Sequence, residues 1–239
     1  MRKIIAAVVM CAAVGLGLII LAGYTPAPYP KSTEGLAEFH RLYGGPQAGV
    51  ALGDDIYYDL NISDVVPLKI ESMPFGYYAT HVGYDNPRLY RIANTDDWIF
   101  EYWKDAWNSL GMSMFYRAGT KTPSPEQAAQ LCVTGNFYPP PGQESKVLFS
   151  TDDMNLVHAA AQALGNGVPQ HTLRLYNAGA LQFRSPEYPG VAVSYHLQRD
   201  RQGQYYVLFF QTCEMPPQFL ACSLPGELNQ AIQEALMIK

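Results

Sequence analysis

The chain has 239 residues, of which 48% are hydrophobic and 15% charged, and its formal net charge is −5. This much apolar material with mixed charge suffices for a buried core, which excludes wholesale disorder. Acidic residues outnumber basic ones by 21 to 16 and no basic cluster occurs, so nucleic acid is a poor partner.

The segment from Ile4 to Gly23 contains no charged residue. As a helix, a segment of this length would span about 30 Å, the thickness of a bilayer's hydrocarbon core. Arg2 and Lys3 precede it, as in a signal peptide or a signal anchor. Cleavage after Gly23 or Ala27 fits the small-residue pattern of a signal peptidase site poorly. We therefore expect an uncleaved membrane-spanning helix, with a cleaved signal peptide as the alternative.

The positive charges before this segment predict that the N-terminus stays in the cytoplasm and that the rest is exported. Without Arg2 and Lys3, the exported part has 14 basic and 21 acidic residues, a net charge of −7. Residues 24–33 contain three prolines and predict a stiff spacer. The expected localisation is membrane-anchored with the bulk extracytoplasmic, or secreted if the signal is cleaved.

Residues 34–118 are expected to form a mostly antiparallel β-rich lobe. It opens with "STEGLAEFHRLYGG", in which the spacing of Leu36, Phe39 and Leu42 predicts a short helix. Four segments rich in aromatic and β-branched residues then predict strands: "DIYYDL", "VVPLKI", "FGYYATHV" and "RLYRIA".

The segment 94–111, "NTDDWIFEYWKDAWNSLG", fits two structures. A helix would place apolar residues from Ile99 to Leu110 on one stripe. A strand over 98–103 would instead pair with "MSMFYRA", residues 112–118. The high aromatic content favours the strand, so we predict a β-hairpin here.

Residues 119–146 are rich in proline, threonine, serine, glycine and glutamine. The run from Pro139 to Gly142 is incompatible with regular structure, and "SPEQAAQL" is a short helical candidate. We expect this stretch to be a linker between two lobes.

Residues 147–239 are expected to form an α-β-β-β-β-α lobe. "STDDMNLVHAAAQALGNG" predicts a helix that begins with Ser150 and Asp153 in capping-box spacing. "TLRLY", "LQFRS" and "FLACS" predict strands, and "VAVSYHLQRDRQGQYYVLFFQ" predicts a hairpin whose turn is bounded by Asp200 and Gly203. A closing helix is expected to start at Pro225. With the N-terminal helix of residues 1–23, the predicted fold class is α+β.

The sequence contains no convincing catalytic, cofactor or metal site. None of the five histidines shares metal-ligand spacing with another on one element. His158 is the best general-base candidate, and Cys132 could pair with His158 or His171 as a nucleophile. Nothing around Cys132 provides an activating element. Because no metal-ligand spacing or cofactor-binding motif occurs either, we predict no cofactor and no metal.

A disulfide between Cys213 and Cys222 is predicted from the spacing in "QTCEMPPQFLAC". A hairpin with a two-residue loop at Pro217 and Gln218 would place the two cysteines opposite each other in a non-hydrogen-bonded pair. The Cα atoms of such a pair lie about 4.5 Å apart, a distance that a disulfide tolerates.

The expected function is a binding or assembly role at the cell envelope. The expected partners are the membrane, through Ile4 to Gly23, and an envelope protein or glycan. Two alternatives stay open: an envelope hydrolase that uses Cys132 or His158, and a purely structural envelope component.

Overall fold

The computed structural model describes residues 32–42, 48–60, 64–79, 86–104, 110–169, 173–210 and 219–237. From Thr33 on, these residues belong to one compact unit that extends to Lys239. They form a closed seven-stranded barrel and a second sheet, and this part of the chain contains two α-helices. The predicted α+β fold class is therefore wrong, because the structure is mainly β.

The predicted membrane-spanning helix also finds no support. Among the residues that the structure describes, no helix is long and apolar enough to cross a membrane. The segment from Ile4 to Gly23, on which the prediction rested, lies outside the described residues.

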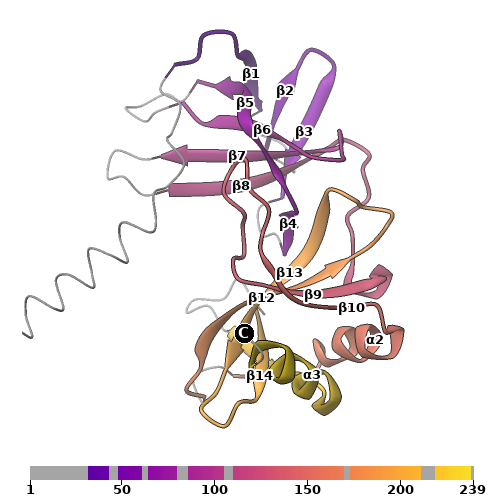
Figure 1. Cartoon of the computed structure of the whole chain (residues 1–239). Coiled ribbons are helices and arrows are strands. Elements are labelled where there is room, and N and C mark those ends of the chain that lie inside the picture. The colour runs from indigo at the N-terminus through magenta and orange to yellow at the C-terminus, as the bar shows by residue number, and fades with distance from the viewer. Residues whose placement is uncertain are drawn as a thin grey trace, which may run out of the picture. The chain divides into compact units, whose positions relative to one another are not determined.

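The barrel closes on itself through one parallel strand pair, β1 with β5. Its other neighbouring strands are antiparallel and follow the order β1-β2-β3-β8-β7-β6-β5 (Figure 1). The strands are β1 (Ala37–Leu42), β2 (Gly49–Leu52), β3 (Asp55–Asp59), β5 (Ile70–Tyr78), β6 (Arg88–Ile92), β7 (Trp98–Lys104) and β8 (Leu110–Arg117).

Strand β1 replaces the short helix predicted near the start of this lobe. Phe39 is buried whereas Glu38 and His40 are exposed, which is the two-residue period of a strand. The β7–β8 hairpin confirms the strand interpretation of the aromatic segment, since Ile99 pairs with Phe115 and Trp98 with Tyr116.

The second sheet has the strand order β10-β9-β12-β13-β14-β15-β11. Strand β4, which comes from the chain between β3 and β5, also pairs with β13. The strands are β4 (Val65–Pro67), β9 (Gln130–Thr134), β10 (Val147–Thr151), β11 (Val168–Pro169), β12 (Tyr176–Arg184), β13 (Val191–Arg199), β14 (Tyr205–Phe210) and β15 (Phe219–Ser223).

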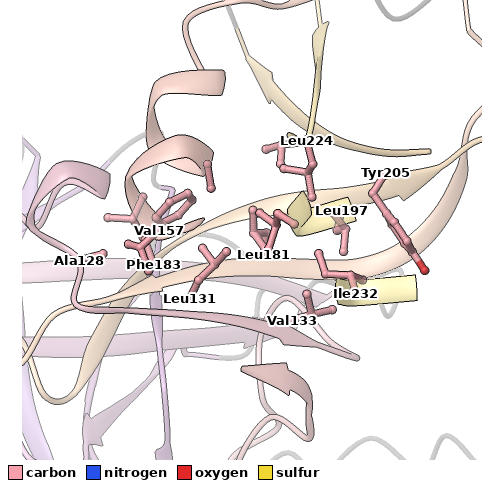
Figure 2. Packing of buried hydrophobic residues seen from close by; sticks show 14 residues of the cluster. Ala128, Leu131, Val133, Val157, Leu181, Phe183, Leu197, Tyr205, Leu224 and Ile232 are labelled. Atoms are coloured by element: carbon pink, nitrogen blue, oxygen red, sulfur yellow. The ribbon is translucent and has the colours of Figure 1, made fainter. Parts of the chain in front are cut away.

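Two helices, α2 (Met154–Ala163) and α3 (Gly226–Met237), pack on one face of this sheet. Their fully buried side chains Val157 and Ile232 meet Leu181 and Leu197 of the strands in one apolar cluster (Figure 2). The predicted helices and the β13–β14 hairpin are confirmed, and the Gly203 amide donates to the Asp200 carbonyl across its turn at 3.3 Å.

Residues 119–146, the expected linker, contain the 3₁₀ turn η1 (Pro125–Gln127) and β9, which lies inside the sheet between β10 and β12. The segment also contacts the chain around β5. The Gly142 amide donates to the Ile70 carbonyl at 2.9 Å, and Lys69 Nζ lies 2.9 Å from Glu144 Oε1. The division into two lobes stays a prediction, but the segment between them is part of the packed structure.

Candidate functional site

A cleft of about 750 Å³ opens beside the turn between β6 and β7. Its walls come from that turn, from the end of β8 and from the turn that precedes β13. Seven charged residues of both signs line it: Glu71, Arg91, Asp96, Asp97, Arg117, Lys121 and Glu187. Its size matches the range of about 300–1,000 Å³ that is typical of ligand sites.

The two turns that wall the cleft are held close to each other. A Cβ atom at Gly190 would lie 2.5 Å from the Thr95 methyl carbon and 2.7 Å from the Ala93 carbonyl oxygen, so this contact requires glycine. Asn94 adopts a left-handed φ of 66°, which asparagine tolerates better than most residues. The Asp97 amide donates to Thr95 Oγ1 at 3.2 Å. These local contacts give the cleft a fixed wall.

Arg91 and Arg117 have partners at the edge of the cleft. Arg117 Nη2 lies 3.4 Å from Asp55 Oδ1 and donates to the Tyr57 hydroxyl at 3.3 Å. Arg91 Nη1 lies 3.8 Å from Asp96 Oδ1, and its guanidinium stacks on the ring of Phe75.

Four other charges in the cleft have no ion-pair partner in the described part of the chain: Glu71, Asp97, Lys121 and Glu187. The cleft therefore presents to a ligand one cation and three carboxylates that have no ion-pair partner among the described residues.

The barrel interior contains a second cluster of interacting side chains. An apolar layer includes Phe39, Tyr57, Leu89, Ile99 and Phe115. Inward side chains recur every second residue of a strand. At the next interior positions along the same strands, the residues are polar. These positions, together with Tyr78 of β5, form what we name the polar layer: Arg41, Asp59, Tyr78, Glu101 and Ser113.

Contacts connect the members of the polar layer directly. The Tyr78 hydroxyl donates to Glu101 Oε1, and Arg41 Nη1 donates to the Tyr78 hydroxyl at 3.0 Å. Arg41 Nη2 lies 3.6 Å from Asp59 Oδ2. Burial raises the pKa of both the Glu101 and the Asp59 carboxyl, although nearby Arg41 lowers each of them. Burial and the Glu101 carboxylate also raise the pKa of Tyr78.

The structure does not bring Cys132 and His158 together. Leu131 and Val133, the neighbours of Cys132 in β9, pack in the apolar cluster with Val157 of α2, so Cys132 faces the opposite side of the sheet. Its thiol is buried and donates to Gln130 Oε1 at 3.4 Å, and burial raises its pKa. His158 is exposed on α2. The other histidine predicted as a partner of Cys132, His171, lies outside the described residues.

The strand register around Cys222 differs from the predicted one. Cys222 pairs with Val207 of β14, and Phe219 pairs with Phe210, so β15 does not fold back at a two-residue loop. Within the described residues Cys222 is buried and has no disulfide partner, and its Sγ donates to the Leu164 carbonyl at 3.3 Å. Cys213 lies outside the described residues, so the disulfide itself stays a prediction.

No known protein family, curated protein or solved structure matches this chain. Both the cleft and the polar layer were missed by sequence reasoning. For the polar layer a signal existed, because Glu101 lies two residues after Ile99 in a strand and therefore shares its inward face. For the cleft no local signal exists, since its walls come from distant turns.

Proposed function

We propose that this chain is an exported binding module and that its cleft receives an extended, polar segment of a partner protein. The observation that carries the proposal is the set of charges without an ion-pair partner around a cavity of about 750 Å³ with a fixed wall: Lys121, Glu71, Asp97 and Glu187. A segment with both acidic and basic side chains would complement such a lining.

A folded wall favours binding because little order must be created when the partner arrives. Here the wall consists of strand ends and of turns held by backbone hydrogen bonds, including the Arg117 amide to the Asp97 carbonyl at 2.7 Å. The cleft therefore has the features of a docking site that is formed before the ligand binds.

A glycan ligand is less well supported than a peptide. Sugar sites commonly use an exposed aromatic face, yet Trp98, which lines the cleft, is only 2% exposed and packs against the ring of Tyr116. A hydrolase that pairs Cys132 with His158 is less well supported, because these two residues lie on different sides of the helix-covered sheet. Export is inferred from the apolar segment after Arg2 and Lys3.

The test places a photo-crosslinking amino acid at Thr120, a residue of the cleft wall, and irradiates cells that produce the full chain. We expect a discrete adduct with a protein, and we expect Lys121→Glu in the same chain to reduce its yield about tenfold, the effect of losing about 1.4 kcal/mol. Lys146→Glu, which reverses an exposed lysine outside the cleft, is the matched control and should leave the yield unchanged.

Two results would refute the proposal. If neither Lys121→Glu nor Lys146→Glu lowers the yield of the adduct, the cleft does not hold the partner. Mass spectrometry that finds only carbohydrate on the probe would show that the ligand is a glycan.

A further inference from the structure

The polar layer of the barrel has an excess of carboxyl groups over basic groups. Among the described residues that point into this part of the barrel, the charged side chains are Arg41 from β1, Asp59 from β3 and Glu101 from β7. Tyr78 from β5 is the remaining titratable group. Of the other three strands, β2 and β6 contribute the apolar side chains of Val50 and Leu89, and β8 contributes the hydroxyl of Ser113. With both carboxyls ionised, the layer carries one net negative charge.

Arg41 does not serve the two carboxyls equally. It pairs with Asp59, and its second contact is to the Tyr78 hydroxyl rather than to Glu101. The direct partners of Glu101 are neutral hydroxyls, those of Tyr78 and Ser113. Glu101 is also the more deeply buried of the two acids, with 3% of its surface exposed. Its charge is therefore the less well compensated one.

An incompletely compensated charge in a barrel interior is costly, because water no longer solvates it and a single cation without a direct ion pair to it offsets only part of the loss. The least expensive relief is the addition of one proton to a carboxyl. The proton comes from solvent and returns to it, and no other bond changes.

We propose that the polar layer is a pH-operated switch, in which Glu101 and Asp59 share one proton in mildly acidic surroundings and release it in alkaline surroundings, loosening this end of the barrel. Both carboxyls have raised pKa values, which agrees with the charge count. The inference does not depend on the proposed function of the cleft, whose charged lining consists of other residues.

The sign of the effect on stability follows from linkage. Above the ordinary glutamate pKa of 4.5, the folded state keeps a proton that the unfolded state has lost. The Glu101 carboxyl therefore contributes fully to the free energy of unfolding below pH 4.5. This contribution is lost as the pH rises through the raised pKa of the folded state. Each pH unit by which the pKa is raised changes the unfolding equilibrium constant tenfold.

The experiment measures the unfolding equilibrium constant of the full chain at pH 5 and pH 8 in three forms: wild type, Glu101→Gln and the control Glu227→Gln. Glutamine preserves the shape of Glu101 and removes its charge. We expect wild type and the control, which alters an exposed glutamate of α3, to unfold more readily at pH 8 than at pH 5. For each form we divide the unfolding equilibrium constant at pH 8 by that at pH 5. This ratio should be at least tenfold smaller for Glu101→Gln than for wild type.

A direct titration keeps the test decisive if Glu101→Gln does not fold. In wild-type protein labelled with ¹³C at the glutamate carboxyls, one resonance should titrate above the others, and Asp59→Asn should shift its midpoint downward. The proposal is overturned if all glutamate carboxyls titrate together near 4.5. It is equally overturned if Glu101→Gln keeps the same pH ratio as the control.

Discussion

The barrel and the second sheet bury their strands in two different ways. The sheet has a separate cover, because α2 and α3 supply Val157 and Ile232 against its apolar face. The barrel covers itself, and its interior changes from an apolar layer to a polar one along the same strands. Stability in the sheet should therefore depend mainly on packing, whereas in one part of the barrel it should also depend on charge and pH.

The largest effect should come from the apolar cores, and it tests whether the two regions unfold together. Leu181 in the sheet and Leu89 in the barrel are both fully buried. Truncating either to alanine should cost about 2–5 kcal/mol, from lost burial and the cavity left behind. Because β4 pairs with β13, we expect one shared transition in each variant.

Two probes can distinguish the regions in denaturant unfolding. All three tryptophans lie between residues 98 and 107, and Trp98 is buried in β7, so its fluorescence reports on the barrel. Circular dichroism at helical wavelengths reports on α2 and α3. Separate transitions from the two probes would contradict the shared transition. The control Val168→Ala, at an exposed position, should change the free energy of unfolding by no more than about 0.5 kcal/mol.

The comparison also explains which parts of the fold could be predicted. Helix α3 and the β13–β14 hairpin carry their signals locally, in a 3.6-residue apolar stripe and in the turn from Asp200 to Gly203. The start of the barrel carries a misleading local signal. Leu36, Phe39 and Leu42 have helical spacing, but in the structure Phe39 alone of the three is fully buried. Pairing of β1 with β5 decides this region, and that contact is not local.

The candidate site was harder to predict than the fold. Glu101 lies in the aromatic strand "WIFEYW", where a lone carboxylate would ordinarily mark a solvent-facing position. Closure of the barrel turns this position inward, next to Tyr78. The cleft likewise depends on the approach of Gly190 to Thr95, from turns far apart in the sequence.

An intermediate effect should come from the Tyr78 hydroxyl and would sharpen the contrast between the layers of the barrel. Tyr78→Phe removes the phenolic donor of the buried Glu101 carboxylate, which should cost about 1–3 kcal/mol. This hydrogen bond lowers the pKa of Glu101, so its loss raises that pKa further. The destabilisation should therefore be larger at pH 8, where a larger fraction of Glu101 is ionised, than at pH 5.

The matched control for this variant is Tyr57→Phe, in the apolar layer of the same barrel. The Tyr57 hydroxyl accepts from the guanidinium of Arg117, which is partly exposed. Its loss should cost less and show no such dependence on pH. Equal pH dependence of the two variants in denaturant titrations would argue against a special role for the polar layer.

The smallest effect concerns the cover of the sheet and the residue that begins α2. The sequence places Ser150 and Asp153 in capping-box spacing, but in the structure Ser150 belongs to β10 and Asp153 is the N-cap. Asp153 Oδ1 accepts from the Asn155 amide at 2.9 Å. Asp153→Ala should cost about 1 kcal/mol because an amide of the first turn loses its partner. Ser150→Ala should be nearly neutral in the same chemical denaturation, and a larger loss from Ser150 than from Asp153 would mean that the helix begins where the sequence predicted.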